Sequence, residues 1–143
     1  RRALPVLLHT WGTPPQFEAA LTIARRFPDL TVILAHGGST NPDAYIRTVL
    51  AAPNIVMDTC FSRCPAGLVE YLVARAGAER VVFGSDCYFY SLTQQLGKIM
   101  AADLDEEALR LVLCGNAERI LAASRPAPEE QPRRQAPAER EGQ

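Results

Sequence analysis

The sequence predicts a parallel α/β fold in which one strand-and-helix unit is used four times. Four short apolar runs, rich in β-branched residues, recur with their middles about 25 residues apart. Each run is continuously apolar rather than alternating, which is typical of strands covered on both faces, and helical patterns lie between the runs. The predicted strands are residues 6–8, 32–34, 55–57 and 81–83.

The composition indicates one soluble globular domain. The chain has 143 residues, of which 48% are hydrophobic and 22% charged, and this length can bury a sizeable core. The net charge of -1 gives no indication of nucleic acid or a membrane surface as a partner. No apolar run reaches the roughly 18 residues of a membrane span. We therefore expect binding to neither nucleic acid nor membrane.

The four cysteines lack the C-x-x-C pairs of a structural zinc site. Nothing in the sequence indicates secretion, so we expect reduced and mostly buried thiols in a cytoplasmic protein. The chain opens on Arg1 rather than Met and reaches its first predicted strand directly after Pro5. We therefore expect no leader, and a chain that is either a fragment or lacks its true beginning.

The first two helices are predicted from caps and apolar stripes. Thr13 can cap a helix with Pro14 and Pro15 in its first turn, where a missing amide hydrogen costs nothing. Asn41 followed by Pro42 marks the second start in the same way. The inner faces are expected to carry Phe17, Leu21 and Ala24 in the first helix, and Tyr45, Ile46, Val49 and Leu50 in the second.

The third helix is predicted to begin near Pro65 and to end at Gly77, which suits a left-handed C-cap. Its apolar stripe predicts that one face packs against the sheet, as in the first two helices. The stripe consists of Leu68, Val69, Leu72, Val73 and Ala76.

The pattern changes after the fourth strand. Apolar spacing predicts a helix over 92–99, and the capping box at 103–106 predicts another that runs through Leu113. Gly115 and Asn116 are expected to break that helix and cap a last one. We expect a folded domain over residues 1–124 and a disordered tail over 125–143, which is rich in Pro, Glu, Arg and Gln and has no aliphatic or aromatic anchor beyond alanine.

Polar side chains follow each predicted strand, at the point where it ends. In a parallel α/β fold these ends meet at one edge of the sheet, where binding and catalytic groups gather. Both histidines of the chain occupy such positions, so we expect the two to act together. The strand-end segments are His9-Thr10, residues 35–38, Asp58-Thr59 and Gly84-Ser85-Asp86.

His9, His36 and Asp86 form a candidate site for a divalent metal. Imidazole and carboxylate suit zinc, and a catalytic zinc site keeps a position open for water. Taken singly, each histidine is equally well a hydrogen-bonded, partly buried side chain. For Asp58 we favour hydrogen bonding within the loops over a direct role. Gly37-Gly38 before a helix is a weaker candidate for a phosphate cradle, because the lysine of a P-loop is missing.

Five motifs in order and at matching spacing resemble the amidohydrolase-related family across residues 4–123. That family contains metal-dependent hydrolases and decarboxylases, such as aminocarboxymuconate semialdehyde decarboxylase. The resemblance implies a TIM-type (β/α)8 barrel, of which this chain supplies the C-terminal half: strands five to eight and the closing helices. The motifs are residues 5–10, 27–38, 54–59, 80–86 and 115–121.

The resemblance also implies roles for the strand-end residues. His9 corresponds to a metal ligand, His36 to an acid or base beside the metal, and Asp86 to a ligand that can also take a proton. The family's first strand normally brings an H-x-H pair, and these residues contain no such segment. We therefore expect a divalent metal, with zinc first among the candidates, held weakly or not at all by the isolated chain.

The chemistry implied is metal-activated water, with His36 or Asp86 moving the proton. Hydrolysis of a C–N or C–O bond and loss of a carboxylate from an activated acid would both use it, and the sequence does not choose between them. A small-molecule substrate is expected, with Trp11 and Arg63 as candidate contacts and residues 88–90 as an aromatic wall.

Two other interpretations remain open. The first is an inactive truncated barrel that acts only through self-association or by pairing with the missing barrel half, because half a barrel exposes two sheet edges and an apolar inner face. The second is a small open-sheet module that binds an anionic ligand at Gly37-Gly38.

Overall fold

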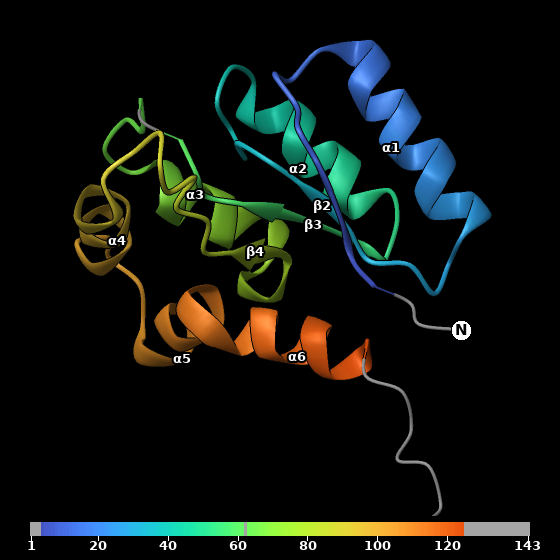
Figure 1. Ribbon diagram of the computed structural model, residues 1–143. Helices are drawn as coiled ribbons and strands as arrows, with labels where there is room; N and C mark the ends of the chain where they lie inside the picture. The colour runs from blue at the N-terminus through green and yellow to red at the C-terminus, as the bar shows by residue number, and fades with distance from the viewer. Residues whose placement is uncertain (1–3, 62, 125–143) are drawn as a thin grey trace, which may run out of the picture.

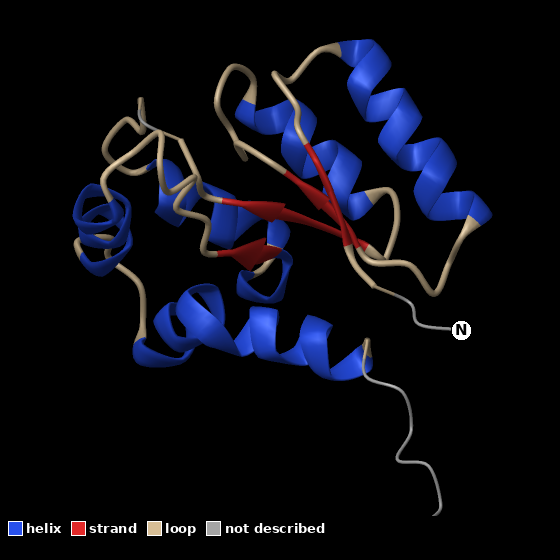
Figure 2. Cartoon of the chain, viewed as in Figure 1, coloured by secondary structure: helices blue, strands red, loops and turns tan. Residues whose placement is uncertain are grey.

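The computed structural model describes residues 4–61 and 63–124 and consists of four βα units followed by a helical segment. The tail expected over 125–143 lies outside the described residues. Figure 2 shows the four strands side by side, with helices on both sides of the sheet. The units are β1 (Val6–Leu8) with α1 (Pro14–Arg26), β2 (Val32–Leu34) with α2 (Pro42–Leu50), β3 (Ile55–Asp58) with α3 (Leu68–Ala76), and β4 (Val81–Val82) with α4 (Leu92–Met100).

The strands form one parallel sheet in the order β1-β2-β3-β4, so each strand lies beside its neighbour in the sequence. The register aligns the strand ends, with Leu8 opposite Leu34 and Leu34 opposite Met57. All four strands therefore deliver the residues that follow them to the same edge of the sheet. The predicted strands and their parallel arrangement are confirmed.

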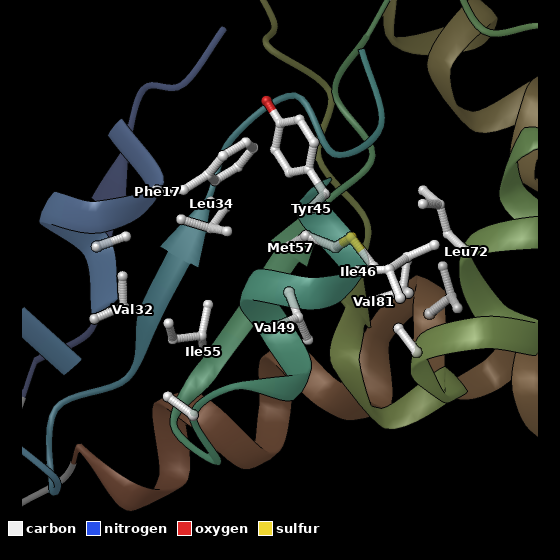
Figure 3. Packing of buried hydrophobic residues seen from close by; sticks show 14 of the residues in the cluster. Phe17, Val32, Leu34, Tyr45, Ile46, Val49, Ile55, Met57, Leu72 and Val81 are labelled. Carbon is white, nitrogen blue, oxygen red and sulfur yellow. The ribbon is translucent and has the colours of Figure 1, made fainter. Parts of the chain in front are cut away.

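The outer face of the sheet is covered by α1, α2 and α3 (Figure 1). Every second residue of the strands packs with residues of these helices in one continuous apolar core. Figure 3 shows Val32 and Ile55 of the sheet pointing into it. The core is closed by aromatic side chains, because the rings of Phe17 and Tyr45 pack edge to face with centroids 4.9 Å apart.

The opposite, inner face of the sheet is covered in part by the last helix, α6 (Asn116–Ala123). Ile120 packs on Val56 and Val82 and buries both, whereas Leu7 on β1 keeps 60% of its surface exposed. The apolar inner face that was expected to be exposed is therefore covered on the β3–β4 side and exposed toward β1.

The two edges of the sheet also differ. No further strand lies beside β4 among the described residues, but the Phe83 N–H donates to the Val112 carbonyl (2.8 Å) and the Asn116 side-chain amide donates to the Val81 carbonyl (2.9 Å). These bonds use the groups that a further strand would need. At the other edge, β1 has no strand partner within the described part of the chain. The sheet thus has one open edge, not the two that were expected.

The helical segment after α4 departs from the prediction. Instead of a break at Gly115, α5 (Glu106–Arg110) continues through a π turn (Leu111–Gly115) directly into α6. Gly115 has helical angles (φ -58°, ψ -39°), and the Asn116 amide donates to Val81 and Ala78 rather than capping a helix. The local break signal is overridden because the π turn and Asn116 together satisfy the outer edge of β4.

Two smaller points complete the fold. A 3-10 turn, Ala78–Arg80, separates α3 from β4. The helix α3 ends at Gly77 as predicted, but the angles of Gly77 (φ 94°, ψ 141°) are open to glycine and lie outside the left-handed helical region, so the predicted left-handed cap is wrong. Among the described helices, none combines the length and apolar character that crossing a membrane requires.

Candidate metal and proton-transfer site

The carboxyl ends of the strands surround a hollow of about 460 Å³. His9 follows β1, His36 follows β2, Asp58 ends β3 and Asp86 follows β4, and all four line this hollow. A second hollow of about 490 Å³ shares His9, His36 and Asp86 with the first. The three residues predicted as a metal site therefore border the same space, although they are 27 and 50 positions apart in the sequence.

His9 and His36 are in direct contact. The Nδ1 atom of His9 lies 3.1 Å from Nε2 of His36, and the ring centroids are 4.7 Å apart at 82°. Nδ1 of His36 lies 2.6 Å from the carbonyl oxygen of Cys60, which can only accept a hydrogen bond. His36 therefore carries its proton on Nδ1, and its Nε2 lone pair faces His9. For a neutral imidazole, this geometry assigns the Nδ1–H tautomer to His36.

Asp58 holds the backbone of His36 and of Cys60. One carboxylate oxygen, Oδ1, accepts from the His36 N–H (2.9 Å) and from the Cys60 N–H (3.0 Å). The Asp58 side chain is only 5% exposed, so neither bond competes with much water. The loop hydrogen bonding that was favoured for Asp58 is thus present, and it fixes two neighbours of the site.

His36 and Asp86 both adopt the left-handed backbone conformation that non-glycine residues avoid. Their φ angles are 62° and 48°. The first is supported by Asp58, and the second by a turn in which the Asp86 carbonyl accepts from the N–H groups of Phe89 (3.1 Å) and Tyr90 (3.2 Å). Strained backbone of this kind is concentrated at functional sites, which supports a role for both residues.

Cys60 is the buried thiol of the site. Burial, together with the nearby Asp58 carboxylate, raises the pKa of Cys60 to about 12, so the thiol is neutral. Its sulfur lies 3.4 Å from Nδ1 of His36, on the ring edge away from His9. His36, Cys60 and Asp86 bring ligand atoms within 4.8 Å of one another, but an ion shared with the thiol would have to displace the Nδ1 proton from its bond to the Cys60 carbonyl.

The other cysteines differ from expectation. Of the four, only Cys60 is buried; Cys64 is half-buried and Cys87 and Cys114 are exposed, and all four are free thiols. The prediction of reduced thiols agrees with this, while the prediction that they are mostly buried is wrong. Exposed positions were not foreseen because cysteine is apolar enough to suggest burial wherever it occurs.

An aromatic wall lies beside the histidines. The Trp11 ring stacks on His36 with centroids 5.2 Å apart and 16° between the planes, and meets His9 edge-on at 4.8 Å. Phe89 and Tyr90 line the second hollow together with Trp11. Tyr88 is fully exposed and Arg63 is exposed, and neither is among the residues that line the two hollows. Trp11 is therefore adjacent to the site, and Arg63 is not.

Gly37 and Gly38 serve the packing around His36. The Gly37 N–H donates to the Asp58 carbonyl (2.9 Å), and a Cβ at this position would lie 2.5 Å from that oxygen. Gly38 has a φ of 83° and lies against Leu68. Because the Gly37 N–H is already bonded, it is not free to hold an anion, which weakens the phosphate-cradle interpretation.

Lys98 is a neighbour of the site that the sequence did not reveal. Its ammonium donates to the carbonyl oxygens of Thr59 and Phe61, the latter at 2.8 Å, and to the Gln95 side chain (2.5 Å). Burial lowers the pKa of Lys98. The only signal in the sequence is its spacing of three from Gln95, which puts two polar residues on one face of a helix.

The donor types present suit a divalent ion, although the ligand atoms that lie within 4.8 Å of one another are those of His36, Cys60 and Asp86, without His9. A bare imidazole nitrogen of His36, the imidazole of His9 and the carboxylate of Asp86 are ligand types that zinc and manganese both accept. The 3.1 Å between Nδ1 of His9 and Nε2 of His36 is close to the spacing of two nitrogens bound to one ion at about 2.0–2.1 Å.

Parallel βα units with polar groups gathered at the strand ends define the C-terminal half of a TIM-type barrel. A TIM-barrel protein from Bordetella bronchiseptica, 23% identical, superposes with a TM-score of 0.69 over 85% of this chain and 47% of its own. A 2,6-dihydroxybenzoate decarboxylase from Rhizobium, 15% identical, gives a TM-score of 0.64 over 84% of this chain and 51% of its own.

A dihydroxybenzoic acid decarboxylase from a Polaromonas species, solved with bound manganese and the inhibitor 2-nitroresorcinol, is 16% identical, with a TM-score of 0.61 over 78% of this chain and 41% of its own. The chain thus spans about half the length of these proteins or less. No curated protein matches it in sequence. The amidohydrolase family model matches residues 1–122, and the chain belongs to that family.

Proposed function

We propose that this chain carries the strand-five to strand-eight part of the active site of a metal-dependent hydrolase or non-oxidative decarboxylase. The observation that supports this most directly is the contact between Nδ1 of His9 and Nε2 of His36, in a hollow that Asp86 also lines. Membership of the amidohydrolase family and decarboxylases among the solved structures of the same fold add to it. The whole activity needs groups beyond these three.

In this proposal the three residues divide the work. His9 and Asp86 hold the ion, and zinc is the metal we propose first. When bound, a divalent ion polarises an oxygen of the substrate and makes water more acidic. His36 accepts or donates the proton through Nε2, because Nδ1 is engaged by the Cys60 carbonyl. Trp11 lies flat on the imidazole of His36 and limits the access of water to it.

The aromatic wall favours decarboxylation over hydrolysis. Trp11, Phe89 and Tyr90 line a hollow with His9, His36 and Asp86, and such a lining suits a planar aromatic acid. In the proposed step a proton is added to the ring carbon that bears the carboxylate. The C–C bond then breaks, its electrons restore the aromatic ring, and carbon dioxide leaves. Hydrolysis of a C–N or C–O bond is the alternative.

Zinc binding tests the site. Isothermal titration of the metal-free chain with zinc should give weak binding that dialysis reverses, because the two proposed ligands, His9 and Asp86, are fewer than the three protein ligands of catalytic zinc. His9→Ala and Asp86→Ala should abolish the binding heat. Asp29→Ala is the matched control. It removes an exposed carboxylate in the turn before β2, at the opposite end of the strands from the site, and should bind zinc as the unmodified chain does.

Release of carbon dioxide from 2,6-dihydroxybenzoate, measured with zinc or manganese present, tests the reaction class. In a complete barrel containing these residues, His36→Ala should chiefly lower turnover while metal content is retained. Equal zinc binding by the unmodified chain and both ligand variants would contradict the metal site. Zinc held tightly through dialysis would contradict the expected shortage of donors.

We further propose that the chain associates with itself or with a complementary half-barrel through β1. This strand is the open edge of the sheet, and Leu7 on its inner face and Leu4 before it are 60% and 59% exposed. An unpaired edge next to exposed apolar side chains favours pairing with another strand. A monomer at all concentrations by light scattering would contradict this proposal.

A further inference from the structure

The backbone at residues 59–61 forms a tight turn around Cys60. The Phe61 N–H donates to the Thr59 carbonyl (2.8 Å), which closes a three-residue turn. Inside the turn, the Cys60 N–H donates to Asp58 (3.0 Å). The Cys60 carbonyl is then directed at Nδ1 of His36, 2.6 Å away. The protonation pattern of His36 therefore depends on the orientation of one peptide group.

Lys98 holds this turn from the helix side. Its ammonium donates to the carbonyls of both end residues, Thr59 and Phe61, so it spans the turn without touching Cys60 itself. Its third acceptor is the Gln95 side chain, which is completely buried. No carboxylate pairs with Lys98 in the described residues.

A purely structural role does not explain this arrangement well. A half-buried ammonium that is matched only by uncharged oxygens loses hydration, and an apolar side chain of similar length would pack in the same place without that cost. The ammonium adds several N–H donors on a single nitrogen, so it can donate hydrogen bonds to two carbonyls of one turn at the same time.

We propose that Lys98 is a positioning residue for the site: by holding the two ends of the 59–61 turn, it aims the Cys60 carbonyl at Nδ1 of His36 and keeps the Nε2 lone pair of His36 free toward His9. The functional importance of this positioning rests on the proposed function, in which an unprotonated Nε2 of His36 accepts a proton or a metal. The tautomer itself does not depend on any activity.

The Cys60 thiol is the competing explanation. Its sulfur lies 3.4 Å from the same Nδ1 and is a weaker acceptor than the carbonyl. Removing the thiol leaves the carbonyl in place, whereas removing the Lys98 ammonium leaves both acceptors but frees the turn. The two explanations therefore predict opposite results for two single substitutions.

The experiment measures the tautomer of His36 in the metal-free chain, with nitrogen-15 in the histidine rings and at a pH where histidine is neutral. Long-range proton–nitrogen spectra distinguish Nδ1–H from Nε2–H, and His9→Ala assigns the signals because the chain has 2 histidines. We expect Nδ1–H to dominate by at least about fivefold in the unmodified chain, as one ordinary hydrogen bond would give.

Lys98→Met should lower that ratio about fivefold, while Cys60→Ala and the helix control Gln94→Met should leave it unchanged. Lys98→Gln, which keeps an uncharged NH2 group with two N–H donors, should lower it less and replaces the methionine variant if that does not fold. An unchanged ratio in whichever Lys98 variant folds overturns the proposal, as does a shift in Cys60→Ala alone. Zinc binding can be absent while the tautomer ratio is as expected, and the tautomer ratio can be wrong while zinc still binds. A failure of this proposal is therefore distinguishable from a failure of the proposed function.

Discussion

His36 and His9 both follow a parallel strand and touch each other, yet they are supported very differently. His36 follows the interior strand β2 and is 5% exposed. Its backbone N–H donates to Asp58, its Nδ1–H donates to the Cys60 carbonyl, and the Trp11 ring stacks on its imidazole. His9 follows the open edge strand and is exposed, with His36 as the one hydrogen-bond partner of its ring in the described residues.

The difference separates what interior strands can do from what an edge strand can do. At the end of β3, the Asp58 carboxylate and the Cys60 carbonyl both accept hydrogen bonds from His36 and fix it before any ligand arrives. Within residues 4–61 and 63–124, β1 has a strand neighbour on one side only, so His9 is supported from that side alone. The site is therefore pre-organised on the His36 side and dependent on further contacts on the His9 side.

The largest effect should come from removing the support of His36. Asp58→Ala leaves two buried N–H groups without an acceptor, and we expect it to lower the free energy of unfolding by about 2–4 kcal/mol. Asp58→Asn keeps an oxygen in the same place and should cost less than half as much. Urea denaturation of the two variants measures this, and equal losses would mean that charge, not hydrogen bonding, is what Asp58 contributes.

A pH effect should follow from Cys60, on the same side. Its pKa is raised from 9.0 to about 12 in the folded chain, so above pH 9 the unfolded chain loses a thiol proton that the folded chain keeps. The free energy of unfolding should therefore fall as pH rises from about 9 toward 12, by at most about 1.4 kcal/mol per pH unit from this group.

Cys60→Ala should remove that part of the fall, and Cys114→Ala, at an exposed thiol, should not. Denaturation curves at several alkaline pH values measure both. The same slope in all three proteins would show that the Cys60 thiol ionises as freely in the folded chain as in the unfolded one.

The open edge can be tested by charge. Leu7→Lys places an ammonium on the inner face of β1 and should reduce self-association without changing the stability of the monomer by more than about 0.5 kcal/mol. Leu50→Lys on α2 is the matched control, since Leu50 is 58% exposed and Leu7 60%. Light scattering over a concentration series should detect the difference; similar association of both variants would exclude β1 as the interface.

The smallest effect should be that of His9 on the metal-free chain. His9→Ala loses one exposed contact and should change the free energy of unfolding by less than about 0.5 kcal/mol. His36→Ala, by contrast, loses a buried bond and a stacked ring and should cost about 1–3 kcal/mol. If the two variants are equally stable in thermal or urea denaturation, the support described for His36 has no energetic value.

The strands and the meeting of His9, His36 and Asp86 could be predicted because they depend on simple rules. Continuous apolar runs marked the strands, and parallel strands bring the residues after them to one edge. The geometry of these three residues, and which of them binds a metal, could not be predicted, because it depends on loop conformations that no spacing encodes.

The support of the site was beyond prediction for a different reason. It is made by backbone groups, such as the Cys60 carbonyl, and by Lys98, whose partners are carbonyls 37 and 39 positions away. Main-chain atoms are the same in every residue, so the sequence carries no mark of which ones take part. The helix break expected at Gly115 was wrong. The continuous helix lets Val112 and Asn116 bond to the outer edge of β4, and these tertiary hydrogen bonds outweigh the local preference of Gly115 to end a helix.

The closed outer edge of β4 sets a limit on how copies of this chain can assemble. A head-to-tail chain of sheets would need β1 of one copy to pair with β4 of the next, but Val112 and Asn116 already hold the groups on β4 that this pairing would use. Strand pairing between copies of this chain through β1 is therefore mutual, edge against like edge. Such contacts close on themselves, so assembly through this strand ends at a pair and cannot grow into a fibre.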